Sequence, residues 1–517
     1  MIEELRDPAR YPDSAARVEL AETHISWVLL TGSFAYKIKK PVNLGFLDFS
    51  TLEARRHYCE EELRLNRRTA PELYVAVVPI SGTSREPAIG GAGAAIEYAV
   101  KMRQFDQNRL LDRVAKRGEL SYEHVDALAR TVAEFHYRID AAPAASEFGN
   151  PEHVLAPAMQ NFDQLAALIK ETGDLAAISE LRNWTRSSYA ALAGFLARRK
   201  REGYVRECHG DLHLGNIALL QGRPVPFDCI EFNEELRWID VMSEIAFLVM
   251  DLHDHRLPGL AASCLNVYLE STGDYAGLRV LRFYSVYRAM VRAKIACIRA
   301  HQSGLAAGAA ARLLDEMRGY LVLARDLALS GRRALVITHG LSGSGKTTVA
   351  SLIAESTGAV RIRSDVERKR LHGMAGQARA REGLYEGLYS AAATRATYER
   401  LAALAGEILD ADYPVIVDAA FLKREERARF HAIAKERRVP YVTAACRAPD
   451  AVLRNRVAAR ERAGTDASDA TLAVLERQFE FSEKLQAEEL TFAVAFDTGA
   501  DAGSLAAALD ALKQRLA

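Results

Sequence analysis

The sequence predicts an α+β domain followed by an α/β domain with a parallel sheet. In the first part of the chain, strand-like segments lie within residues 23–105, and long helical stretches follow them. After residue 330, short apolar runs alternate with helical stretches, which is typical of a parallel α/β sheet. We therefore expect two domains, residues 1–330 and 331–517, with the boundary at Ser330–Arg333, where a helical run ends.

The bulk composition is that of a globular, non-secreted protein. Hydrophobic residues make up 49% of the 517 residues and charged residues 26%. The 68 basic and 68 acidic side chains cancel, so no global positive field favours nucleic acid. The six cysteines form no CxxC pair, and the acidic, polar start lacks an apolar signal region. These features predict a cytoplasmic protein without membrane spans, disulfides or a zinc site.

The elements of the first domain follow from its hydrophobic pattern. HISWVLLTG and FAYKIKKPV predict two strands joined by a turn at Gly32 and Ser33. Residues 49–68 have helical character, and AAIEYAVKMRQF (94–105) predicts another strand. Residues 108–200 are expected to be helical with a Pro/Ala-rich break near 142–157, and residues 240–329 are again mostly helical.

A phosphate-binding loop opens the second domain. Its glycines let the backbone wrap phosphates closely, its lysine meets their negative charge, and its hydroxyl side chain holds magnesium. The loop lies between the apolar run ALVITH and the helical run TVASLIAEST, as such a loop requires. We expect the following residues to bind ATP, with Thr347 also on the metal: Gly340, Ser342, Gly343, Ser344, Gly345, Lys346, Thr347 and Thr348.

Two acidic residues follow strands of this domain. Asp365 comes after the run AVRIR, where ligands of open α/β sheets bind, and it is either the base that takes the acceptor proton or an N-cap. Asp418 ends YPVIVD and is either a magnesium-supporting acid or a plain strand-end residue. On a later arginine-rich helix, Arg456 and Arg460 are four residues apart and share a face, either as a lid over the phosphates or as a solvated basic face.

These motifs resemble a group of P-loop kinases. GLSGSGKTT, RSDVERKRL, VIVDAAF and the arginine-rich stretch are similar to gluconate kinase, zeta-toxin-like kinases and the kinase domain of polynucleotide kinase, over about residues 334–517. The resemblance implies that Asp365 activates the acceptor hydroxyl and that lid arginines contact ATP.

The first domain carries an independent phosphotransfer signal in CHGDLHLGNI (208–217). Asp211 and Asn216, five residues apart on a tight loop, match a base and a magnesium ligand, and Asp228 follows twelve residues later as a second metal ligand. Upstream, Lys37 and Lys39 share one face of a strand; either can hold phosphates, and Lys39, nearer the strand end, is preferred.

The helix of residues 49–68 offers a partner for that lysine. Glu61 is the expected partner, and Glu60 and Glu62 compete for the role. Because a kinase lysine pairs with a glutamate of the following helix, one of the three should face the strand.

The first domain resembles the aminoglycoside phosphotransferase and choline kinase family. HGDLHLGNI, FDCIEFN and DVMSEIA carry the resemblance, over roughly residues 20–325. It implies a two-lobed protein-kinase-like fold, Asp211 as base, Asn216 and Asp228 as magnesium ligands, and Asp240 as a buried brace for the catalytic loop. The TGS turn at residues 31–33 is very short for a flap over ATP.

The two sites together predict a bifunctional kinase that uses ATP and Mg²⁺. Each domain is expected to phosphorylate a hydroxyl group of a small molecule, for which a sugar or aminosugar is one candidate. Two alternatives remain: a C-terminal domain that phosphorylates nucleic-acid 5′-hydroxyl ends, which the neutral charge disfavours, or a domain that binds ATP only to regulate. The sequence does not determine the oligomeric state.

Overall fold

The chain forms two compact units in the computed structural model. The structure describes residues 1–517 apart from residues 14, 44, 46, 303–304, 330, 375–389, 464–470 and 517. One unit, here the N-terminal unit, contains Met1–His255 and Phe283–Leu321; the other, the P-loop unit, contains Arg256–Arg282 and Val322–Ala517. Ser330, at the expected boundary, lies outside the described residues. Within the described ranges, none of the helices combines the length and apolar character needed to cross a bilayer.

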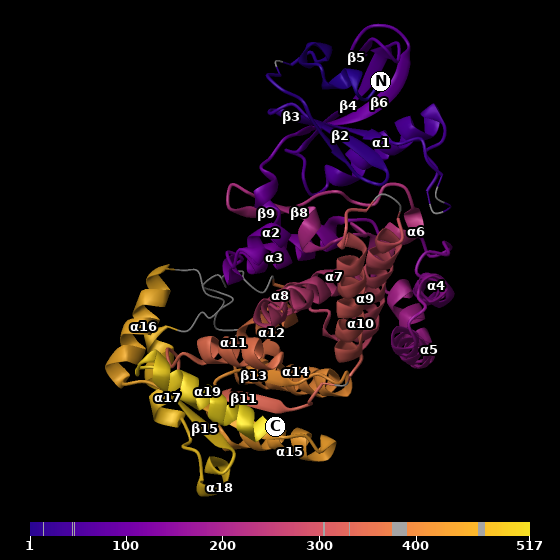
Figure 1. Ribbon diagram of the computed structural model, residues 1–517. Helices are drawn as coiled ribbons and strands as arrows, with labels where there is room; N and C mark the ends of the chain where they lie inside the picture. Colours follow the sequence, from indigo (N-terminus) through magenta and orange to yellow (C-terminus); the bar gives the residue numbers. More distant parts are fainter. Residues whose placement is uncertain are drawn as a thin grey trace. The chain divides into compact units, whose positions relative to one another are not determined.

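The N-terminal unit begins with a six-stranded antiparallel sheet of order β1-β2-β3-β6-β4-β5 (Figure 1). Its strands are β1 (Glu19–Glu22), β2 (Ser26–Leu30), β3 (Phe34–Lys39), β4 (Tyr74–Gly82), β5 (Pro87–Ile89) and β6 (Ala95–Arg103). Helix α1 (Leu52–Asn66) packs against β4 and β6. The predicted hairpin, helix and strand are confirmed, and residues 31–33 alone connect β2 to β3.

Helices and two short strand pairs follow. The helices are α2 (Leu111–Lys116), α3 (Tyr122–Arg138), α4 (Pro151–Leu168), α5 (Thr172–Arg201), α6 (Glu234–Arg237), α7 (Val241–Asp254), α9 (Leu278–Ala300) and α10 (Ala309–Ala328). The expected break is shorter than predicted, because α4 starts at Pro151, where a proline needs no hydrogen bond, and continues past Pro157. Strand β7 (Val205–Glu207) pairs with β10 (Trp238–Asp240), and β8 (Ile217–Leu220) with β9 (Arg223–Pro226).

The P-loop unit is built on a parallel five-stranded sheet of order β12-β13-β11-β14-β15. All five predicted strands are confirmed, as β11 (Leu335–His339), β12 (Val360–Arg363), β13 (Val415–Asp418), β14 (Tyr441–Arg447) and β15 (Ala493–Asp497). The phosphate-binding loop therefore follows the central strand, at the carboxyl edge where open α/β sheets bind ligands.

Helices cover this sheet, and one of them comes from far upstream in the sequence. They are α8 (Pro258–Thr272), α11 (Lys346–Thr357), α12 (Ser364–Leu371), α14 (Ala391–Asp410), α15 (Arg424–Arg437), α16 (Asp450–Ala463), α17 (Leu472–Phe481), α18 (Ala487–Leu490) and α19 (Ala502–Leu516). Val349 and Ile353 of α11 pack on Val336 and Ile416 of the sheet, and Leu512 of α19 joins the same buried cluster. Helix α8 packs against α11 and β12.

Candidate active sites

The loop of residues 208–216 connects β7 to β8 in the N-terminal unit. Two carboxylates of α7 hold its backbone: Glu244 accepts hydrogen bonds from the N–H groups of His209 (3.0 Å) and Gly210 (2.7 Å), and Asp251 accepts one from Leu214 (2.8 Å). Arg288 donates to the Gly210 carbonyl oxygen (3.1 Å). A buried loop keeps its shape only when its backbone groups are paired, so α7 and α9 fix this loop.

Asp240, the brace implied by the resemblance, has a different role. Its carboxylate accepts hydrogen bonds from Arg199 Nε (2.6 Å) and Nη2 (2.8 Å) and caps α7 through the Met242 N–H (2.8 Å). The expectation for Asp240 is wrong because this residue is the N-cap of α7, and the side chain that reaches the loop is Glu244, one turn further along. A glutamate within the largely apolar run VMSEIAFLVM is the sequence signal that could have identified it.

The loop brings two of the three predicted phosphotransfer residues, Asp211 and Asn216, into contact, and the third, Asp228, follows strand β9. Asn216 Nδ2 donates to Asp211 Oδ2 (2.9 Å) and to the Asp211 carbonyl oxygen (3.0 Å). Phe227 N–H donates to the Asn216 carbonyl oxygen (2.9 Å), which places Asp228, the next residue, close to this pair. Asp228 has a φ of 65°, a left-handed conformation that costs energy outside glycine and is typical of functional positions.

Charged neighbours keep Asp211 ionised. Burial would raise the pKa of the Asp211 carboxyl, but the imidazole of His213, with Nε2 3.5 Å from Oδ2, and the charges of His209 and Arg292 hold it below its usual range. His209 and His213 also stabilise the loop: His209 Nε2 bonds to the Phe227 carbonyl oxygen (2.8 Å), and His213 Nδ1 accepts from the Gly215 N–H (3.1 Å).

Lys37 and Lys39 of β3 share one face, as predicted, and both meet Glu62. Lys37 Nζ lies 2.8 Å from Glu62 Oε1 and 2.6 Å from Asp228 Oδ1. Lys39 Nζ lies 2.7 Å from Glu62 Oε2 and also pairs with Glu231, and its side chain is 1% exposed. Burial disfavours the Glu62 carboxylate, but the two ammonium groups lower its pKa to about 2.

The predicted pairing of Lys39 with Glu61 is therefore wrong, and Glu62 is the partner of Lys39. Consecutive helical residues point about 100° apart, so only one of them faces the sheet. Glu61 instead pairs with Arg64 (2.9 Å) and Arg237 (3.7 Å), while Glu60 pairs with the exposed Arg56. Sequence alone does not give the helix phase to one residue, which is what this choice requires.

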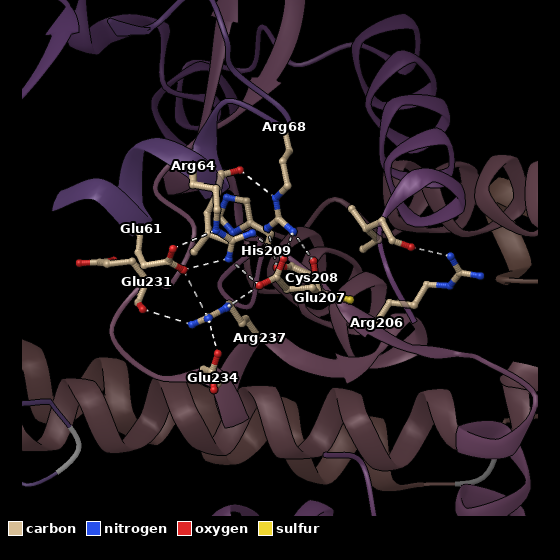
Figure 2. A network of polar contacts seen from close by, with 12 residues as sticks. Glu61, Arg64, Arg68, Arg206, Glu207, Cys208, His209, Glu231, Glu234 and Arg237 are labelled. Carbon is tan, nitrogen blue, oxygen red and sulfur yellow. Dashed lines mark hydrogen bonds and ion pairs between the residues drawn. The ribbon is translucent and has the colours of Figure 1, made fainter. Parts of the chain in front are cut away.

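Glu61 belongs to an ion-pair network centred on Glu207, which Figure 2 shows. Arg64 at the end of α1 lies 2.7 Å from Glu207, and Arg68 just beyond it lies 3.0 Å away. Arg68 also donates to the Glu207 (2.7 Å) and Cys208 (3.2 Å) carbonyl oxygens. The helix that carries Glu62 is thereby tied to the start of the loop that carries Asp211.

The P-loop of the second unit depends on its glycines. Gly340, Gly343 and Gly345 have φ values of 147°, 82° and 77°. A Cβ at Gly340 would collide with the Cys446 carbonyl oxygen, and one at Gly343 would lie 2.8 Å from the Leu453 carbonyl oxygen. Only glycine combines these conformations with this close packing.

The interior of the P-loop fits an anionic ligand. The Ser344 hydroxyl is buried and has no hydrogen-bond partner among the described residues. Lys346 Nζ donates to the Leu341 carbonyl oxygen (2.8 Å) within the loop, and Ser342 N–H donates to Gln478 (2.8 Å). A buried hydroxyl left unsatisfied costs free energy, so a phosphate oxygen accepting from Ser344 would satisfy it. Thr347 and Thr348 lie in the first turn of α11.

Asp365 and Asp418 both lie within electrostatic reach of Lys346. Burial lowers the pKa of Lys346 and Arg460 lowers it further, whereas the charges of Asp418 and Asp365 raise it. Asp418 is 5% exposed; burial raises its pKa, and the positive charges of Arg363, Arg361 and Lys346, with a hydrogen bond from Thr347, oppose that rise. Asp365 is not an N-cap, because α12 starts at Ser364 and its cap is Arg363. The capping alternative is therefore wrong.

The two predicted lid arginines differ in their surroundings. Arg456 donates to the Thr498 hydroxyl (2.8 Å) and carbonyl oxygen (2.7 Å) and to the Gly343 carbonyl oxygen (3.3 Å). It thus binds the backbone of the P-loop itself. Arg460 is half-buried and lies close enough to Lys346 to affect its pKa.

Comparisons with known proteins match the two segments of the chain that carry these candidate sites. Residues 52–284 match the family model described as "Phosphotransferase enzyme family", and residues 335–485 match the model described as "AAA domain". Uncharacterized proteins of Mycobacterium tuberculosis and Mycobacterium bovis are each 30% identical to the chain over 459 residues, which is 89% of this chain and 89% of each relative. The chain belongs to the family of these mycobacterial proteins.

The chain combines a phosphotransferase segment and a P-loop kinase segment, and the protein is a kinase. Solved structures similar to parts of it include a gluconokinase from Sinorhizobium meliloti, 23% identical over 36% of this chain and 97% of that chain, with a TM-score of 0.24. Another is choline kinase from Cryptosporidium parvum, 10% identical over 63% of this chain and 95% of that chain, with a TM-score of 0.39.

We predict different effects for two neighbouring glutamates. Glu62→Gln removes a buried carboxylate from two buried ammonium groups, so the free energy of unfolding should fall by about 3–5 kcal/mol. Glu61→Gln acts on a partly exposed network and should cost less than about 1 kcal/mol. Urea unfolding, followed at the transition of the N-terminal unit, measures both. Equal losses from the two variants would contradict the assignment of the inward-facing side chain.

A second prediction concerns acid stability. His339 ends β11 and bonds through Nδ1 to the Phe421 carbonyl oxygen (3.0 Å); burial lowers its pKa to about 4, and the charges of Arg427 and Lys346 act in the same direction. Below pH about 6.5 the unfolded chain binds a proton that the folded chain does not, so stability should fall as the pH drops from about 6.5 to 4, by about 3 kcal/mol in total.

The measurement is urea unfolding of the wild type and His339→Gln at pH 7 and pH 4. The variant should lose about 3 kcal/mol less between these two pH values, because glutamine does not titrate. An identical loss in both proteins would show that His339 is not the titrating group.

Proposed function

We propose that the protein is a bifunctional kinase, in which each unit transfers the γ-phosphate of ATP, with Mg²⁺, to a hydroxyl group of a small molecule. One observation carries this proposal: the chain has two separate clusters in which an aspartate lies beside groups suited to phosphate and metal. The first holds Asp211, Asn216 and Asp228. The second lies at the carboxyl edge of the parallel sheet, where Asp418 ends β13 and Asp365 follows the neighbouring strand β12, and the charges of both act on Lys346.

In the N-terminal unit, Asp211 accepts the acceptor's hydroxyl proton on its ionised carboxylate. Asn216 and Asp228 hold the magnesium ion, since amide and carboxylate oxygens are ligands that Mg²⁺ prefers. Bound Mg·ATP supplies the phosphoryl group. As the acceptor oxygen forms its bond to phosphorus, the bond from phosphorus to the bridging oxygen breaks, and ADP leaves.

In the P-loop unit, the loop backbone and Lys346 neutralise the phosphates, and Thr347 with Asp418 holds magnesium. Asp365 takes the proton of the second acceptor. Arg460, near Lys346, stabilises the negative charge that develops on the transferred phosphoryl group. Arg456 instead holds the P-loop backbone through the Gly343 carbonyl oxygen.

Contacts of the arginines favour a small-molecule acceptor over a nucleic-acid end. Arg361 and Arg363 pair with Glu270, and Arg370 pairs with Glu367. These guanidinium groups are therefore engaged within the protein rather than offered to a phosphate backbone. A sugar or aminosugar remains the first acceptor class to test. The cytoplasm remains the expected compartment, since none of the six cysteines, all in described ranges, forms a disulfide.

The decisive experiment measures ATP consumption by the full-length protein over a panel of hydroxyl-bearing metabolites, with oligonucleotides included. Asp211→Asn and Lys346→Ala should each abolish a different activity, by at least about 100-fold, and leave the other intact. Unfolding curves of both variants control for folding. If neither variant changes the wild-type activity, both site assignments fail. If one variant removes all turnover and the other site still binds ATP, the second unit is regulatory.

We further propose that Lys37, rather than the preferred Lys39, holds the nucleotide phosphates. Lys37 contacts the proposed metal ligand Asp228, while Lys39 is enclosed by Glu62 and Glu231. Lys37→Met should raise the KM for ATP about tenfold with a modest loss of stability. Lys39→Met leaves Glu231 buried without its cation and should cost about 3–5 kcal/mol of unfolding free energy.

Initial rates over an ATP series and urea unfolding separate these effects. A raised KM in Lys39→Met with unchanged stability, beside a normal KM in Lys37→Met, would reverse the assignment.

A further inference from the structure

Helix α8 belongs to the P-loop unit although its sequence lies within the phosphotransferase match of residues 52–284. It is hydrogen-bonded to the edge strand β12: Asn266 Nδ2 donates to the Ala359 carbonyl oxygen (3.0 Å), and Asn266 Oδ1 accepts from the Arg361 N–H (2.6 Å). Asn266 is 5% exposed. The P-loop unit therefore takes one of its helices from outside the P-loop kinase segment.

Glu270, one turn further along α8, holds two arginines of β12. Its Oε2 lies 3.2 Å from Arg361 Nη2, and its Oε1 lies 3.0 Å from Arg363 Nη1. All three side chains are only 12–13% exposed. Arg361 and Arg363 alternate along the strand and so share a face, which lets a single carboxylate bind both.

The two arginines connect Glu270 to the proposed catalytic centre. Arg363 lies opposite Asp418 in the parallel register, with Nε 3.9 Å from Asp418 Oδ2. Arg361 Nη1 donates to the Ser351 hydroxyl (2.5 Å) on α11, the helix that begins at Lys346. Arg363 therefore links Glu270 to Asp418, the proposed metal ligand, and Arg361 links Glu270 to α11, the helix that follows the P-loop.

We propose that Glu270 is a positioning residue of the P-loop site, holding Arg363 back so that the Asp418 carboxylate stays available to magnesium. This inference rests on the proposed function of that site. Besides Glu270, the carboxylate that lies beside Arg363 among the described residues is Asp418, with which a guanidinium released from Glu270 would form a closer, bidentate pair. Such a pair would compete with the metal ion for the same oxygen atoms.

A purely structural clamp predicts something different. If Glu270 only fastened α8 to β12, its loss would lower stability and leave the magnesium dependence of nucleotide binding unchanged. If it positions Arg363, the amount of Mg²⁺ needed for ATP binding must rise. The two possibilities are separated by a binding measurement that does not depend on turnover.

The test is calorimetric titration of full-length protein with ATP over a series of Mg²⁺ concentrations. Binding lost in Lys346→Ala is assigned to the P-loop site. In Glu270→Gln, the Mg²⁺ concentration that half-saturates this binding should rise about tenfold, as for other partners of metal-site residues. Glu270→Asp retains the charge on a shorter side chain and should give a smaller rise; it replaces Glu270→Gln if that variant unfolds.

Asp410→Asn is the matched control, since Asp410 forms a bidentate pair with Arg437 in the same unit (3.0 and 3.1 Å) and is 60% exposed. It should leave the Mg²⁺ dependence unchanged. If folded Glu270 variants need the same Mg²⁺ concentration for ATP binding as the wild type, or if Asp410→Asn shows the same rise, the proposed role of Glu270 is wrong. Neither result contradicts the P-loop site itself. If wild-type ATP binding is no stronger than that of Lys346→Ala, the proposed P-loop function fails and the role of Glu270 fails with it.

Discussion

The hydrogen bonds from the His209 and Gly210 N–H groups to Glu244 are the constraint on which the N-terminal site depends. A glutamate that is 0% exposed is costly unless its charge is paired, and here two backbone donors and His136 (3.0 Å) provide the pairing. The interaction works in both directions. The loop satisfies the carboxylate, and the carboxylate holds the loop in the conformation that places Asp211 beside Asn216.

The same rule of paired buried charge organises the surroundings of β3. Two lysines and two glutamates form a largely buried cluster of ion pairs there, Lys37, Lys39, Glu62 and Glu231, and each charge is tolerated because of the others. The Glu207 network then ties the helix that carries Glu62 to the start of the loop (Figure 2). Strand, helix and loop are held in register by ion pairs rather than by apolar packing alone.

The P-loop unit is suited to phosphate through its backbone rather than through a cluster of ion pairs. Its loop relies on three glycines with positive φ and on backbone N–H groups at the start of α11, with Lys346 as the fixed charge. Helix α8 completes this unit from a distant part of the sequence, so the two compact units are interleaved in the chain although the two kinase segments are consecutive. An excised C-terminal segment that starts after residue 330 would lack Asn266 and Glu270.

The sequence by itself determined what depends on local pattern: the five parallel strands, the β2–β3 hairpin, the P-loop between β11 and α11, and the grouping of Asp211, Asn216 and Asp228. Periodicity and motif spacing suffice for these, because each is specified by residues close together in the chain. Only the tertiary structure decided that Glu62 rather than Glu61 faces Lys39, that Glu244 rather than Asp240 supports the loop, and that Glu270 meets Arg361 and Arg363. Those choices depend on helix phase and on contacts between residues up to about a hundred positions apart, which no local pattern encodes.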